Sequence, residues 1–116
     1  MSGEKTLKRI MLEMGTGNAL HSMDYTKAAI RAVENASHHS SLTMFRSLGI
    51  DPATMQIELT LAAQEPEKID LEAVSKALPF GTVIAKAVKG GLNVNDETSG
   101  RPVVIVNAGL VVRVPL

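Results

Sequence analysis

Apolar and polar residues alternate most regularly in the stretch MQIELTLAAQ, residues 55–64. Every second position there is apolar, and a period of two predicts a β-strand with one buried face and one wetter face. Three other stretches have the apolar and β-branched composition of strands. They are KTLKRIMLEMG (5–15), GTVIAKAVKGG (81–91) and VVIVNAGLVVRVPL (103–116). The polar segment LNVNDETSGRP (92–102) is predicted to be a loop.

Between the first two strands the pattern changes to a helical period. Residues 24–38 are rich in alanine, and Asp24 stands where an N-cap residue is expected. The apolar side chains of this helix gather on one side. The opposite side carries Lys27, Arg31, Glu34, Asn35 and His38. A second, short helix is predicted for LEAVSKAL (71–78), with Asp70 as its cap and Pro79 after its end.

The order strand, helix, strand, helix, strand, strand predicts an α+β fold, with a mixed four-stranded sheet and two main helices on one face. A chain of 116 residues can bury one hydrophobic core, so we expect a single α+β domain over residues 1–116. The first strand has apolar residues on both parities and needs cover on both faces, whereas two short helices cover only one. The chain is therefore predicted to form a homo-oligomer.

Composition narrows the classes of function. Twelve basic residues balance twelve acidic residues, so there is no net charge to attract nucleic acid or an anionic membrane. Cysteine is absent, which excludes disulfides and thiolate metal ligands. The start MSGEKTLKRI lacks the apolar stretch of a secretion signal, and no apolar run approaches the roughly 20 residues of a membrane span. We expect a cytoplasmic protein that binds neither nucleic acid nor membranes.

The stretch EMGTGNALHS (13–22) is the first candidate site, interpreted as a loop between the first strand and the first helix. Its glycines allow backbone conformations that expose N–H groups, and a helix N-terminus follows, which favours anions. The predicted anion-binding residues are Gly15, Gly17, Asp24, Lys27, Arg31, Asn35 and His38. In the alternative interpretation, Asp24 already caps the helix, the glycines only turn the chain, and the polar stripe is a solvated surface.

Two side chains in this stretch are suited to proton transfer. His21 follows the glycines, and Glu13 ends an otherwise apolar strand, where partial burial would suit it to acid–base use. The more common arrangement for such a glutamate is an ion pair, here with Lys27 or Arg31. His21 could also hold a metal with the two other histidines, although the spacing does not show that they meet. A dinucleotide-binding fingerprint and a P-loop are both absent from the sequence.

A family resemblance covers nearly the whole chain. The stretches KRIMLEMGTGNALHSMDYTKAAIRAVENASHHSSL and EPEKIDLEAVSKALPFGTV, followed by VKGGL and VVIVNAGLVV, resemble the Lin0512 family of conserved hypothetical proteins. That family is marked by the loop motif G-x-G-x-D-x-H-G, the helix motif D-x-T-K-A-A-x-R-A-V-x-N-A and an N-S-L turn. The helix motif is matched at Asp24, Thr26, Lys27, Arg31 and Asn35.

The loop motif is matched only in part. Gly15, Gly17 and His21 agree with it, but Ala19 stands at the aspartate and Ser22 at the last glycine. The turn also differs, with Ser40 in place of asparagine. The resemblance implies that these residues belong to a site, and it names no reaction.

The family loop motif is itself similar to the metal-binding start of methylerythritol cyclodiphosphate synthase. That enzyme, Bacillus-type chorismate mutase and the reactive-intermediate deaminases share a related α+β topology and form trimers with sites at subunit boundaries. The likeness implies a trimer and makes His21 a metal ligand. A divalent metal is disfavoured here because the methyl group of Ala19 cannot replace a carboxylate ligand.

Three hypotheses about function follow. The first is a small oligomeric enzyme that acts on an anionic small molecule near the 15–22 loop and the first helix, with His21 or Glu13 transferring protons. The second is a non-catalytic or regulatory partner subunit of a complete paralogue, which the loss of the aspartate at Ala19 favours. The third is a module that binds a small anion. The cofactor, if the reaction uses one, stays unknown.

Overall fold

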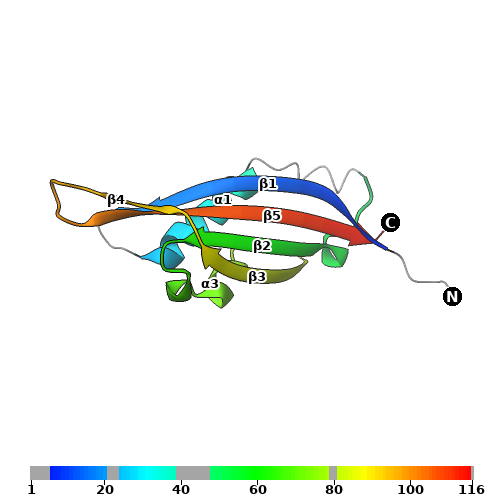
Figure 1. Ribbon diagram of the computed structural model, residues 1–116. Coiled ribbons are helices and arrows are strands. Elements are labelled where there is room, and N and C mark those ends of the chain that lie inside the picture. The colour runs from blue at the N-terminus through cyan, green and yellow to red at the C-terminus, as the bar shows by residue number, and fades with distance from the viewer. Residues whose placement is uncertain (1–5, 21–23, 39–47, 79–80, 116) are drawn as a thin grey trace.

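The computed structural model describes residues 6–20, 24–38, 48–78 and 81–115. Its centre is a mixed five-stranded sheet (Figure 1). Strands β2 and β3 are parallel, and all other neighbouring strands are antiparallel. The order across the sheet is β1 (Leu7–Ala19), β5 (Pro102–Pro115), β2 (Gln56–Ala63) and β3 (Thr82–Lys89), with β4 (Leu92–Asn95) paired to the first part of β5.

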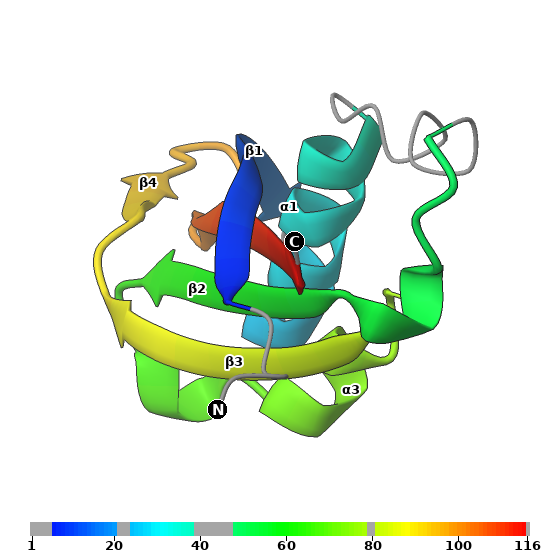
Figure 2. The same ribbon diagram turned by 90° about the vertical axis from the view of Figure 1, so that its right-hand side faces the viewer.

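The helices lie on one face of this sheet, called the inner face below. Helix α1 (Tyr25–His38) packs on β1 and β5, and α3 (Leu71–Ser75) packs on α1 and β3. Figure 2 shows α1 beside β1 and β5, with α3 beneath β3. The single-turn helices η1 (Pro52–Thr54) and η2 (Pro66–Lys68) precede β2 and α3. None of the helices in the described ranges is long and apolar enough to cross a bilayer.

Both predicted helix caps are confirmed. Asp24 Oδ1 accepts a hydrogen bond from the backbone N–H of Lys27 at 3.0 Å, and Asp70 Oδ1 accepts one from Ala73 at 3.2 Å. Each bond satisfies an N–H group that has no partner within its own helix. The predicted start of each helix therefore agrees with the structure.

The core lies between α1, α3 and the inner face of the sheet. Buried positions alternate along β2 and β5, so each strand turns one side chain in two toward the helices. Alanine dominates the buried side of α1, and its small side chain lets the helix axis come close to the sheet. The buried α1 residues are Tyr25, Ala28, Ala29, Ala32, Val33 and Ala36.

This close approach explains the glycines of β1. A Cβ atom at Gly15 would overlap the backbone of Ala32 and Ala36, and one at Gly17 would overlap the backbone of Ala28 and Ala32. The strand can pass under α1 only because these positions have no side chain. The interpretation of residues 15–19 as a loop is therefore wrong, since they continue strand β1 to Ala19.

The strand count also differs from the prediction. Residues 92–95, placed in a polar loop, form β4, in which Leu92 pairs with Ile105 and Val94 with Val103. The strand is only four residues long, and its two asparagines have a low propensity for strands, so the sequence favoured a loop. The sheet thus has five strands and not four, while the α+β class and the mixed sheet are confirmed. The likeness to the chorismate mutase fold and the extent of the domain stay predictions.

Candidate functional site

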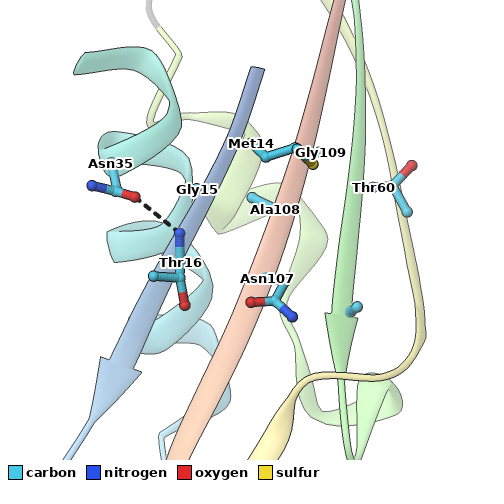
Figure 3. Close-up of a pocket in the computed structure, with 9 residues that line it drawn as sticks. Met14, Gly15, Thr16, Asn35, Thr60, Asn107, Ala108 and Gly109 are labelled. Atoms are coloured by element: carbon cyan, nitrogen blue, oxygen red, sulfur yellow. Dashed lines mark hydrogen bonds between the residues drawn. The ribbon is translucent and has the colours of Figure 1, made fainter. Parts of the chain in front are cut away.

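The predicted ligand stripe of α1 runs along the edge strand β1. Arg31 Nη1 donates a hydrogen bond to the backbone carbonyl of Asn18 at 2.8 Å. One turn later, Asn35 Oδ1 accepts a hydrogen bond from the backbone N–H of Thr16 at 3.0 Å (Figure 3). Both side chains satisfy backbone groups on the unpaired side of an edge strand. Two of the predicted ligand residues therefore have structural partners.

The other predicted residues are not gathered with them in one place. Lys27 is exposed, and its backbone N–H is bonded to the exposed cap residue Asp24. His38 is the last residue of α1. His21, Ser22 and Ser40 lie outside the described residues, so the predicted catalytic and metal-ligating roles of His21 stay predictions. No group of three or more carboxylate or imidazole side chains suited to a metal occurs in the described part of the chain.

Glu13 lies on the inner side of β1. Its register partner in β5 is Leu110, which is buried under the helices, and paired residues of antiparallel strands turn their side chains to the same face. Glu13 is itself half-buried. Arg31 bonds instead to Asn18, so the ion pair predicted between Glu13 and Arg31 is not among the contacts of the described residues.

A hollow of about 500 Å³ lies over β1 and β5. It begins on the outer face of the sheet, opposite the helices, and reaches the β1 edge at Asn35 (Figure 3). Its lining comes from three strands and one helix and consists of Met14, Gly15, Thr16, Asn35, Thr60, Ala62, Asn107, Ala108 and Gly109. Gly15 and Asn35 were predicted as site residues, whereas Thr60, Asn107 and Gly109 were not.

Gly109 gives the hollow its floor. It lies within β5 between Met14 of β1 and Thr60 of β2, which are its register partners. A Cβ atom built on Gly109 meets no atom of the described residues within 4 Å, and its φ is not among the positive glycine values found there. Neither backbone strain nor close packing within the chain therefore requires glycine here. This sets Gly109 apart from Gly15 and Gly17.

The hollow is lined by neutral hydrogen-bonding groups. Thr60 lies beside Gly109 on β2, and Asn107 precedes Gly109 by two residues on β5 (Figure 3). None of its lining residues within the described ranges is an acid or a base. The nearest charge in the register is Lys86, which pairs with Thr60 across β2 and β3. Both residues also border a smaller hollow of about 190 Å³, together with Glu58.

Glu58 has a cationic partner on the same outer face. Its carboxylate forms an ion pair with the guanidinium of Arg113, which comes from β5. Lys86 and the Glu58–Arg113 pair thus place both signs of charge at one end of the hollow. Because Arg113 neutralises Glu58, Lys86 supplies an ammonium group that an anionic ligand could contact.

A polar cluster elsewhere ties three elements together. The hydroxyl of Tyr25 donates to Glu65 Oε2 at 3.0 Å and accepts from Asn93 Nδ2 at 2.8 Å. The Lys68 ammonium and the Tyr25 hydroxyl both bond Glu65 and lower the pKa of its carboxyl group. Burial raises the pKa of Tyr25. This cluster joins α1, η2 and β4 and is a structural contact, which sequence spacing did not indicate.

The comparisons with known proteins bear on family and fold. Residues 9–112 match the family model described as conserved hypothetical protein (Lin0512_fam). Among solved structures, the chain is similar to a FtsZ-like protein of unknown function from Nostoc punctiforme PCC 73102, with 32% sequence identity and a TM-score of 0.83. The match covers 97% of this chain and 99% of that chain. The search of curated proteins gave no match.

Proposed function

Within the Lin0512 family of conserved hypothetical proteins, to which this chain belongs, we propose that the chain binds a small anionic molecule in the hollow over Gly109. The observation that carries the proposal is a glycine in mid-strand that no intramolecular contact requires. Glycine weakens a strand relative to residues with side chains, and it often marks a place where a ligand or another backbone comes close.

The surrounding side chains support this choice of ligand. The Thr60 hydroxyl and the Asn107 amide offer hydrogen-bond donors and acceptors next to Gly109. The Lys86 ammonium lies next to Thr60 in the register and can neutralise a carboxylate or phosphate. The thioether of Met14 adds an apolar wall. A few convergent polar groups in an otherwise apolar hollow are typical of small-molecule sites.

The proposal extends to assembly and catalysis. We expect the chain to act as a homo-oligomer, with a trimer as the arrangement that the chorismate mutase likeness implies. If the ligand is a substrate, proton transfer by His21 or Glu13 stays a prediction, because the lining residues within the described ranges carry no acid or base. In the non-catalytic version the chain is a regulatory subunit, and the methyl group of Ala19 in place of a carboxylate supports it.

Ligand-induced thermal stabilisation tests the proposal. Inorganic phosphate, pyrophosphate and succinate are the probes, and neutral succinamide is the control ligand. Gly109→Val fills the floor with a side chain that strands favour, so the variant should fold and lose the response to the anions. Lys86→Gln should lower the response to the charged probes at least about tenfold in apparent affinity, roughly 1.4 kcal/mol.

Lys76→Gln is the matched control, since Lys76 is an exposed lysine paired only loosely with Glu72 at 3.8 Å, away from the hollow. Its response to the probes should equal that of the unaltered protein. If Gly109→Val keeps the full response to all three anions, the hollow is not the anion site.

A further inference from the structure

The outer face of the sheet carries a set of large apolar side chains that are open to solvent. Their exposed fractions range from 39% at Val88 to 72% at Met14. They lie on three strands, β1, β3 and β4, and the register places them all on the same side. The set consists of Leu12, Met14, Ile84, Val88, Leu92 and Val94.

The register shows how these residues form one surface. Leu12 lies in a row with Val111, Glu58 and Ile84 across β1, β5, β2 and β3. Two rows further along the sheet, Val88 of β3 pairs with Ala62 of β2. Beyond the end of β2, strand β4 takes the position beside β5, and there Leu92 pairs with Ile105. No helix in the described part of the chain covers this face. Apolar patches of this kind usually mark an interaction site.

From this surface we infer that a second copy of the chain packs its own outer face against this one and closes the hollow over Gly109. The inference rests on the proposed function and deepens it, because it names the surface through which the copies meet. Two outer faces that pack on each other form a two-fold contact, so this surface predicts a dimer in place of the trimer that the chorismate mutase likeness implies.

The accessible surface has the size that such an interface needs. The chain exposes 6902 Å² at a mass of 12.3 kDa. A monomeric protein of that mass is expected to expose about 6,100 Å². The elongated shape contributes to this surplus. Its two longer extents, 60 and 27 Å, leave room for the roughly 800 Å² that each partner contributes to an interface of standard size.

The charges of the outer face favour a copy of the same chain over other partners. Glu58, Lys86 and Arg113 place both signs on the face, and the chain as a whole has no net charge. A nucleic acid or an anionic membrane would require an excess of positive charge. A face with both signs can instead be complementary to itself.

The edges of the sheet make a face-to-face contact more favourable than an extended sheet. At the β1 edge, Arg31 and Asn35 already bond the backbone of Asn18 and Thr16. The opposite edge strand, β3, carries exposed lysines at positions 86 and 89, and lysines on edge strands oppose pairing with another strand. The apolar outer face is the surface left for association.

The oligomeric state tests this inference. Light scattering after size exclusion, together with native mass spectrometry at micromolar concentrations, should show the unaltered protein as a dimer or larger assembly. Ile84→Lys and Leu92→Lys place a charge on the outer face at half-exposed positions that the monomer tolerates. Each should weaken self-association at least tenfold while the far-ultraviolet circular dichroism stays unchanged.

Leu48→Lys is the matched control, because Leu48 is 65% exposed but lies before η1 and outside the sheet. Its assembly should equal that of the unaltered protein. A monomeric wild-type protein, or Ile84→Lys and Leu92→Lys variants that assemble normally, would overturn the inference. Assembly and anion response are separate readouts. A Gly109→Val variant that keeps its anion response would overturn the binding site alone, whereas an unaltered protein that is monomeric but responds to the anions would overturn this inference alone.

Discussion

Asn35 of helix α1 holds strand β1 at its open edge, because its Oδ1 accepts the backbone N–H of Thr16 at 3.0 Å. Neighbouring strands leave the groups on this side of β1 unpaired, since β1 is the first strand of the sheet. The side chain thus replaces a missing strand at this point. The same residue lines the hollow, so the packing of α1 and the shape of the candidate site depend on one contact.

Asn35→Ala should therefore lower the free energy of unfolding by about 1 kcal/mol, since it leaves the Thr16 N–H without its acceptor. Asn35→Asp keeps an acceptor oxygen at the same place and should retain most of the stability. Denaturant unfolding measures both. Glu34→Ala, at an exposed neighbouring position, is the control. Equal stability of Asn35→Ala and Glu34→Ala would show that the bond contributes nothing.

Alanine at two strand glycines should have opposite effects. Gly17→Ala places a methyl group against the backbone of α1, and the overlap should destabilise the protein by about 1–3 kcal/mol or more. Gly109→Ala meets open space and should stabilise it by about 0.5 kcal/mol, because glycine loses more backbone entropy on folding. Thermal unfolding of the two variants checks the prediction, and a large loss in Gly109→Ala would reveal a contact made outside the single chain.

Ala19→Asp should be strongly destabilising. Ala19 is 1% exposed on the inner face, so the carboxylate would lie in the core without a described cationic partner. We expect a loss of at least about 3 kcal/mol in the absence of metal. Ala53→Asp, at an exposed alanine of η1, should change stability little. If a divalent metal restores the stability of Ala19→Asp, position 19 adjoins a metal site; if Ala19→Asp is as stable as Ala53→Asp, its buried placement is wrong.

The Tyr25–Glu65–Lys68 contacts predict a pH dependence. The pKa of Glu65 is lowered in the folded protein, so the unfolded chain takes up a proton first as the pH falls below about 4.5. The stability that Glu65 contributes is present above that pH and is lost as the pH falls through the folded pKa. The difference in unfolding free energy between the unaltered protein and Glu65→Gln should shrink in this range. Asn35→Ala removes no ionisable group and serves as the control, so its difference from the unaltered protein should not follow this course.

Local pattern was sufficient for most of the secondary structure. The alternation in residues 55–64 predicted β2, and Asp24 and Asp70 marked the helix starts at which they act as caps. These features depend on residues within a few positions of one another, so the local sequence is sufficient to predict them. The family was also recognised from motifs, and the match over residues 9–112 confirms it.

The structural role of the glycines could not be predicted from local pattern. A pair of glycines is equally consistent with a turn and with a close contact. Strand β1 has glycine at positions 15 and 17 because the backbone of α1 passes over them. That distance is a property of the packed fold. Asn107 and Gly109 could be noticed in the sequence, because with Arg113 they interrupt one face of a strand that is apolar at its other positions.

The sequence by itself determined the α+β class, the starts of the helices and the buried sides of α1 and β2, because capping and periodicity act over one or two turns, whereas the second helix ends at Ser75 and not at the predicted Leu78. Only the tertiary structure decided that β5 lies between β1 and β2, and hence that Gly109 has Met14 and Thr60 as neighbours. These pairings join residues far apart in the chain. Their energies depend on the packing of the whole sheet, which no local pattern contains.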